Sequence, residues 1–242
     1  MNNLIRIQDE ESNFHFSGES VDKLGASEYT LVNIVVDMSG SVSSYKNELT
    51  ETIKTIVNSC MYSQRAENLM IRLTTFNNSI YEEHGFSLLS SINVDSYNNG
   101  KTPTGSTSLF DATIDGLQAV KGYGAKLYDQ EFESNGIVFI ITDGDDNNSY
   151  SKISDVKDTL EKINQEEKLE SLRTILIGVN TKVDNLKNKL ENFKNVAGLD
   201  QYIDIENANK SNLAKLANFI SKSISAQSLA LGTGGPSQAI TF

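Results

Sequence analysis

The sequence feature that most constrains the fold is a nearly continuous apolar run from Leu31 to Val36, rich in β-branched residues. A strand of this composition is buried on both faces, as in a parallel sheet covered by helices on both sides. A second run of the same kind, from Ile137 to Ile141, predicts another buried strand. We therefore expect a protein built around a mainly parallel sheet.

The segments between the buried runs carry apolar residues at spacings of three and four, which predicts amphipathic helices. The expected helices cover Val42 to Cys60, Leu109 to Val120, Ile153 to Ile163, residues 182–195 and Leu213 to Ile224. Further strands are expected at Leu69 to Phe76, from Ser79 onward, at Leu172 to Val179 and at Tyr202 to Ile205.

A hairpin through Asn77 and Asn78 would add one antiparallel edge strand to this sheet. The predicted fold class is therefore α/β: a doubly wound, mostly parallel, Rossmann-like sheet with one antiparallel edge strand and helices on both faces.

The length of 242 residues suits one large domain. We place a polar N-terminal extension at residues 1–28, with a short strand around Asn13 to Ser17, and the main domain at residues 29–225. Residues 226–242 are a Gly- and Ser-containing C-terminal tail, and no charged residue follows Lys222. The tail is either a flexible end or a docking segment that covers its own apolar residues, Leu229, Leu231, Ile240 and Phe242.

The net charge of −11 and the absence of a Lys/Arg cluster argue against nucleic-acid binding. Cys60 is the only cysteine, so an intrachain disulfide and a thiolate metal cluster are both excluded, and we expect it on a buried helix face. Charges near the N-terminus and the lack of a long apolar stretch predict no cleaved signal peptide and no membrane span. We expect a cytoplasmic protein, or one exported without a cleaved signal, of bacterial or phage origin and monomeric.

Three loops at the expected carboxyl end of the sheet carry oxygen-bearing side chains, where ligands of open parallel sheets bind. These loops are residues 37–41, 105–109 and 142–144. Carboxylate and hydroxyl oxygens are hard ligands that suit Mg²⁺, Mn²⁺ or Ca²⁺, and nothing nearby suits zinc. The predicted metal-binding residues are Asp37, Ser39, Ser41, Thr107 and Asp143.

Simpler readings of the same residues stay open. Thr102, Thr104, Ser106 or Ser108 could replace Thr107. Serines and threonines at helix starts are also common N-caps, so Ser41 or Ser43 could cap one helix, and Ser106 or Thr107 the next. Gly40 is expected to allow close approach of the first loop, and Asp145 and Asp146 either form a solvated turn or tune the metal and repel acidic partners.

The pattern Asp37-x-Ser39-x-Ser41, followed by Thr107 and then Asp143 within Ile-Thr-Asp-Gly, resembles the metal-ion-dependent adhesion site (MIDAS) of von Willebrand factor type A (VWA) domains. The order of strands and helices from about Tyr29 to Ser225 is similar to that fold as well. The resemblance implies that the three hydroxyls bind the metal directly, whereas Asp37 and Asp143 act largely through bound water.

The resemblance also implies one open coordination position. Neutral hydroxyls leave most of the charge of the cation uncompensated, so the site should favour an anionic ligand, which in this family is commonly a Glu or Asp side chain of a partner protein. We therefore predict a non-enzymatic, metal-dependent protein-interaction domain with no catalytic residue, and we assign no catalysis to His15 or His84, which we expect on the surface or in loops.

Two alternative functions are kept. A haloacid dehalogenase-type phosphatase also places an Asp after a buried strand and uses Mg²⁺, but it needs a second Asp as general acid where this chain has Ser39. A metal-independent interaction module would keep the motif only for loop structure. An EF-hand beginning at Asp143 fails, because its sixth position is Asn148 instead of Gly and its twelfth is Ser154 instead of Glu.

Overall fold

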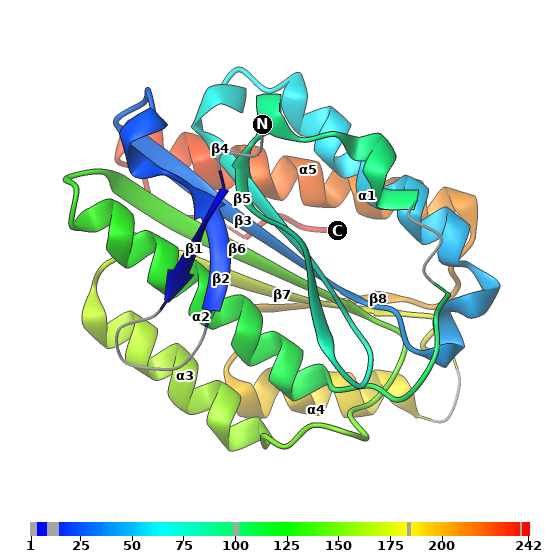
Figure 1. Ribbon diagram of the computed structural model, residues 1–242. Helices are drawn as coiled ribbons and strands as arrows, with labels where there is room; N and C mark the ends of the chain where they lie inside the picture. Colours follow the sequence, from blue (N-terminus) through cyan, green and yellow to red (C-terminus); the bar gives the residue numbers. More distant parts are fainter. Residues whose placement is uncertain (1–3, 9–14, 99–101, 183–184, 238) are drawn as a thin grey trace.

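The computed structural model describes residues 4–8, 15–98, 102–182, 185–237 and 239–242. Over these residues the chain forms one eight-stranded sheet in the order β1-β2-β5-β4-β3-β6-β7-β8, with helices on both faces (Figure 1). The strands are β1 Leu4–Gln8, β2 His15–Glu19, β3 Glu28–Asp37, β4 Leu69–Phe76, β5 Ile80–Leu88, β6 Glu133–Thr142, β7 Leu172–Val179 and β8 Gln201–Ile205. The α-helices are α1 Lys46–Met61, α2 Leu109–Tyr128, α3 Ile153–Glu166, α4 Leu186–Ala197 and α5 Lys210–Thr233.

The centre of the sheet confirms the predicted fold class. β3, the strand predicted from Leu31 to Val36, pairs in parallel with β4 on one side and with β6 on the other. β7 and β8 continue the parallel arrangement, and β4 and β5 form the predicted antiparallel hairpin. Among the described residues, no helix is both long and apolar enough to cross a membrane.

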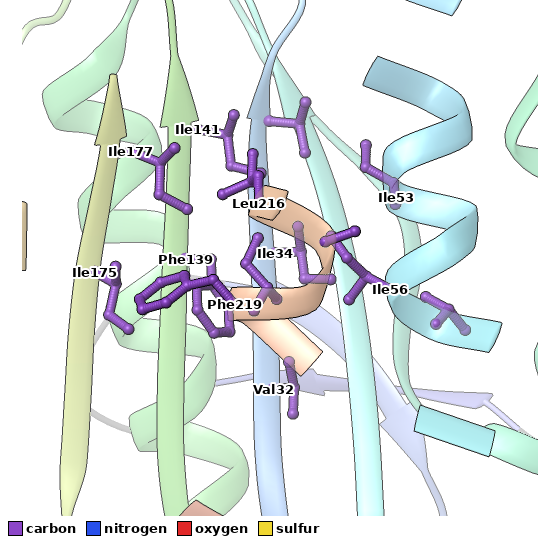
Figure 2. Packing of buried hydrophobic residues seen from close by; sticks show 14 of the residues in the cluster. Val32, Ile34, Ile53, Ile56, Phe139, Ile141, Ile175, Ile177, Leu216 and Phe219 are labelled. Carbon is purple, nitrogen blue, oxygen red and sulfur yellow. The ribbon is translucent and has the colours of Figure 1, made fainter. Parts of the chain in front are cut away.

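The two faces of the sheet are covered by different helices. α1 and α5 pack on one face, where Figure 2 shows Phe219 of α5 beside Phe139 of β6 and Ile56 of α1 beside Ile34 of β3. α2, α3 and α4 pack on the other face, against the strand side chains that point to that side, such as Leu31. Each fully buried aliphatic or aromatic side chain of this kind stabilises the fold by about 1.5–3 kcal/mol, so every central strand is stabilised from both sides.

The sheet extends two strands beyond the predicted antiparallel edge. β2 joins β5 through a single parallel pair, Gly18 with Phe86, and β1 is the antiparallel edge strand beyond it. The strand expected around residues 13–17 is β2, although Asn13 and Phe14 lie outside the described residues. Glu82 of β5 holds β2 in place by accepting a hydrogen bond from the Ser17 amide at 3.0 Å.

The C-terminal segment packs on the domain. α5 continues to Thr233, so residues 226–233 of the predicted tail are helical, and Gln227 inside this stretch donates to the Gly136 carbonyl at 3.2 Å. Beyond the helix, the Arg173 guanidinium donates to the Ser237 carbonyl at 2.5 Å. Phe242 meets Phe219 edge-on, with ring centroids 5.5 Å apart. The tail therefore docks in part: Leu231 is buried, whereas Leu229 and Phe242 stay 57% and 48% exposed. The boundaries at residues 28 and 225 stay predictions.

Several local expectations need correction. Val42 lies in a 3-10 turn, Gly40–Ser44, and α1 begins only at Lys46 because the loop geometry around the motif tightens the first turn. The segment between β5 and α2 contains a short 3-10 helix, Val94–Asn98. Residues 99–101 and, before α4, residues 183–184 lie outside the described part.

The two histidines lie in strands, not in loops. His15 is exposed on β2, and His84 is half-buried on β5, where its Nε2 lies 2.7 Å from the Tyr97 hydroxyl. Cys60 is buried on α1, as predicted, and burial raises the pKa of its thiol to about 12.

Candidate metal site at the carboxyl end of the sheet

The candidate site begins where β3 and β6 end side by side. Val36 and Ile141 are register partners in this parallel pair, so the next residues, Asp37 and Thr142, leave the sheet at the same level. The loops that follow these two residues therefore start next to each other, although more than a hundred positions separate them in the sequence.

The Asp37 carboxylate is held by neutral donors. The Ser39 amide donates to its Oδ1 at 2.7 Å, and the Thr142 hydroxyl donates to its Oδ2 at 2.6 Å. Only 1% of the residue is exposed. Burial raises the pKa of Asp37 to about 6 despite the hydrogen bonds from Thr142 and Ser39, and the negative charge of Asp143 adds to the rise.

A chain of hydroxyls joins the first loop to the third. The Ser39 and Ser41 hydroxyl oxygens lie 3.1 Å apart, and Ser41 donates to Asp143 Oδ1 at 2.6 Å. Burial raises the pKa of the Asp143 carboxyl, while hydrogen bonds from Ser41 and from the buried Tyr45 hydroxyl oppose the rise. Two carboxyl groups and two hydroxyls thus face one another at the end of the sheet.

Thr107 reaches the same place from the second loop. A Cβ added at Gly144 would lie 3.1 Å from the Thr107 hydroxyl oxygen and 3.8 Å from Asp37 Oδ2. The threonine is only 4% exposed, and both its backbone N–H and its backbone C=O are hydrogen-bonded to Asn147. The Thr107 amide donates to Asn147 Oδ1 at 2.8 Å, and the Asn147 amide donates to the Thr107 carbonyl at 3.0 Å. The structure therefore brings all five predicted residues together.

The second loop depends on one glycine. Gly105 has a positive φ of 83°, and a Cβ there would lie 1.9 Å from Asn78 Oδ1, the atom that accepts a hydrogen bond from the Ser106 amide. Gly40, expected to allow the close approach, donates its amide to the Gly105 carbonyl at 3.2 Å. A Cβ at Gly40 would make only an ordinary contact of 3.7 Å, so Gly105 is the glycine that the geometry requires.

Helix capping does not account for these side chains. The N-cap residue of α1 is Tyr45 and that of α2 is Ser108, and neither makes a side-chain capping hydrogen bond. Ser43 donates to the Gly40 carbonyl instead, at 2.7 Å. The alternatives to Thr107 also lie in other environments: Ser108 accepts from Asn148 at 2.8 Å, and Thr102 and Thr104 are exposed.

Four residues at the site were not singled out for this role from the sequence: Tyr45, Asn78, Thr142 and Asn147. Thr142 directly precedes Asp143, so its position at the end of a strand was a usable signal. Asn147 is the fifth position of the EF-hand pattern that would begin at Asp143. Its contacts with Thr107 span 40 positions, and no local pattern indicates them.

Neighbouring acidic residues have partners of their own. Asp145 pairs with Lys189 at 3.0 Å, and Asp146 accepts from the Phe110 amide at the start of α2 at 3.3 Å. Within the described ranges no ion pair involves Asp37 or Asp143. The same part of the chain contains no group of three or more His, Cys, Asp or Glu side chains placed so that they could hold a metal ion.

The donor set fits a hard divalent cation. The buried Asp37 carboxyl and the partly buried Asp143 carboxyl both have raised pKa values and repel each other, and three neutral hydroxyls cannot cancel their charge. A cation at this point would do so with oxygen ligands alone, which are the ligands that Mg²⁺, Mn²⁺ and Ca²⁺ prefer. The set lacks the nitrogen and sulfur ligands that are typical of zinc sites.

Comparison with known proteins supports the fold but not a family assignment. No protein-family model matches the sequence, and no curated protein matches it either. Among solved structures, a variant of the PilB minor pilin from Streptococcus sanguinis has a TM-score of 0.61 at 16% identity, over 90% of this chain and 66% of that one. The pilus adhesin SpaC from Lactobacillus rhamnosus GG has a TM-score of 0.60 at 12% identity, over 92% of this chain and 34% of that one.

The proximal thread matrix protein 1 of the mussel byssus, described with a zinc-occupied MIDAS motif, has a TM-score of 0.55 at 18% identity, over 84% of this chain and 47% of that one. The chain thus spans 34% to 66% of the length of these three proteins. Identities this low establish the fold alone: the chain has a VWA-like α/β fold.

Proposed function

We propose that this chain is a metal-dependent protein-interaction domain of the VWA family, with a MIDAS at the end of its sheet. Asp37, Ser39, Ser41, Thr107 and Asp143 would hold one divalent cation, Mg²⁺, Mn²⁺ or Ca²⁺. The cation would bind an acidic side chain of a protein partner. The observation that carries the proposal is the convergence of the buried Asp37 carboxyl, the partly buried Asp143 carboxyl and three hydroxyls from three loops, without a cationic side chain paired to the carboxyls in the described ranges.

The chemistry of the site supports binding more than catalysis. Asp37 is 1% exposed and both of its oxygens accept hydrogen bonds, so it is poorly placed as the nucleophile of a phosphatase. Ser39, at the position where that class needs a general acid, is a neutral hydroxyl. The absence of catalysis and the cytoplasmic location stay predictions.

The likeness to pilus adhesins and to a thread matrix protein is consistent with a protein partner. The zinc in the byssus protein belongs to that protein. For this chain we propose a preference for Mg²⁺, Mn²⁺ or Ca²⁺ over zinc, because all the proposed ligands are oxygens.

One observation favours a second candidate, a metal-independent interaction module. The hydroxyls of Ser41 and Thr142 already satisfy the two carboxyls within the chain, so the loops have a hydrogen-bonded arrangement of their own. In that reading the motif serves loop structure and the partner binds elsewhere.

Calorimetric titration with Mg²⁺, Mn²⁺, Ca²⁺ and Zn²⁺ distinguishes the two candidates. The proposed function predicts saturable binding of one hard cation per chain, lost in the double variant Ser39→Ala/Ser41→Ala, and partner capture that EDTA abolishes. The absence of cation binding at millimolar concentration, or partner capture that persists in EDTA, would favour the metal-independent module. Circular dichroism of the double variant checks that the fold is intact.

A further inference from the structure

A cleft of about 370 Å³ opens beside the proposed cation site, between α4 and the first turns of α2 and α3. All three helices cover the same face of the sheet (Figure 1). The lining residues that matter here are Phe110, Asp145, Asn188, Lys189, Asn192 and Phe193. Asp145 lies two positions after Asp143, so one short loop connects the cleft to the site.

The cleft combines an apolar base with polar groups at its rim. Phe110 and Phe193 pack with their ring centroids 4.9 Å apart, and Phe110 stays partly exposed. On the surface of α4, Asn188 and Asn192 are exposed; the Asn188 amide donates one hydrogen to Asn185 Oδ1 and has a second hydrogen to donate, as the side-chain amide of Asn192 also has. This combination suits a side chain that has an apolar stem and a polar end.

The charge at the rim of the cleft indicates that the polar end of the bound side chain is a carboxylate. Lys189 lies 3.0 Å from Asp145, with 52% of the lysine side chain and 42% of the aspartate side chain exposed. An ion pair this open to solvent is weak, so an incoming carboxylate can compete for the ammonium group. In a protein with a net charge of −11, Lys189 brings positive charge to the rim next to the proposed cation.

We propose that this cleft binds a second acidic side chain of the partner, carried a few residues away from the one that reaches the cation. The second carboxylate forms an ion pair with Lys189 in place of Asp145 and accepts hydrogen bonds from the side-chain amides of Asn188 and Asn192. The methylene groups of the same acidic side chain lie against Phe110. The partner is thus a protein segment with two spaced acidic residues. This inference rests on the proposed function, because the first acidic residue must be held by the cation.

The test uses synthetic peptides that carry either one Glu or two Glu residues in a Gly/Ser background, with the two glutamates at several spacings. Binding to the full ¹⁵N-labelled chain is followed by NMR with Mg²⁺ and with EDTA. We expect the best two-Glu peptide to bind about fivefold tighter than the one-Glu peptide in Mg²⁺, with shifts in the side-chain amide signals of Asn188 and Asn192. Lys189→Gln should remove the advantage.

Lys187→Gln is the matched control. Lys187 lies on the same helix, has a similar exposure of 54% and pairs with Asp204 outside the cleft. Equal affinity of the two peptides for the unchanged chain, or an advantage that survives Lys189→Gln, overturns the cleft proposal and leaves the cation proposal standing. Binding of both peptides that EDTA does not reduce, or no binding of either, overturns the cation proposal and the cleft proposal with it.

Discussion

The protein buries carboxyl groups in two places and treats them differently. Within the sheet, the Arg72 guanidinium of β4 pairs with Glu82 at 2.7 Å and with Asp115 of α2 at 2.8 Å. At the end of the sheet, Asp37 and Asp143 receive hydrogen bonds only from neutral groups among the described contacts. We call these the arginine cluster and the loop cluster.

The difference separates a structural arrangement from a binding site. In the arginine cluster burial raises the pKa of Asp115, but the charge of Arg72 opposes the rise from inside the protein. In the loop cluster the opposing groups are hydrogen-bond donors without charge, and the negative charge of Asp143 raises the pKa of Asp37 further. A buried site without its own counter-charge is one that an external cation can stabilise.

The largest expected effect is in the arginine cluster. Arg72→Met leaves Glu82 and Asp115 without their cation, and removing one partner of a buried pair costs about 3–5 kcal/mol of unfolding free energy. Denaturant unfolding monitored by circular dichroism measures the loss. Glu82 also accepts a hydrogen bond from the Ser17 amide of β2, so hydrogen exchange of the β2 backbone amides should become faster as well.

A matched exposed pair provides the control. Lys168→Met breaks an ion pair with Asp129 whose side chains are 35% and 64% exposed, and its cost should stay within about 1 kcal/mol. Replacing the cluster together, as Arg72→Met/Glu82→Gln/Asp115→Asn, should recover part of the loss. Equal stability of Arg72→Met and Lys168→Met would show that the arginine cluster contributes little.

The second effect concerns the loop cluster. A saturating cation stabilises the folded state by mass action, by about 2.7 kcal/mol when its free concentration is a hundred times its Kd. Thermal unfolding with and without Mg²⁺ should show this gain in the unchanged chain. It should be absent in Ser39→Ala/Ser41→Ala, which should nevertheless fold in EDTA. The Arg72→Met variant should keep the gain, and its loss there would mean that the two clusters are coupled.

The third effect is a pH dependence of stability that arises from Asp37 of the loop cluster. With a pKa raised from 3.8 to about 6, folded Asp37 keeps a proton that the unfolded chain has already released. The folded state therefore binds more protons between about pH 4 and about 6, and the stability of the cation-free protein should fall as pH rises through this window.

The cation competes with that proton. Its affinity should drop roughly tenfold for each pH unit below about 6. Calorimetry of Mg²⁺ binding and unfolding in EDTA, both from pH 4 to 7, measure the two trends. Asp37→Asn should flatten the stability curve; a curve of unchanged slope in that variant would assign the proton to another group.

The smallest expected effect tests how Thr107 is held. Asn147→Ala removes the side chain that accepts from the Thr107 amide, and one such hydrogen bond is worth about 1 kcal/mol, roughly fivefold in cation affinity. Calorimetric Mg²⁺ titration measures the change. Asn195→Ala, on exposed helix surface, is the control and should bind as the unchanged chain does. Equal affinities in both variants would mean that Thr107 needs no such support.

Sequence alone determined the frame of the fold and the composition of the candidate site. The run from Leu31 to Val36 defines a strand buried on both faces, because its apolar residues leave no polar face for water. Asp37 directly after that strand, and Asp143 directly after β6, place both carboxyls at one end of a parallel sheet. The order of strands and helices along the chain follows from such local patterns, so the residues of the loop cluster could be named from the sequence, whereas the pairing of β3 with β6 that places them side by side could not.

Tertiary structure alone decided which buried charges have partners. Arg72 lies inside a strand, and no local pattern indicates that Glu82 and Asp115, 10 and 43 positions away, would surround it. The contact of Asn147 with Thr107, the addition of β1 and β2 to the sheet and the docking of Phe242 on Phe219 are equally non-local. Periodicity reports which face of an element is apolar, whereas ion pairs and hydrogen bonds between distant segments depend on how those faces are assembled in space.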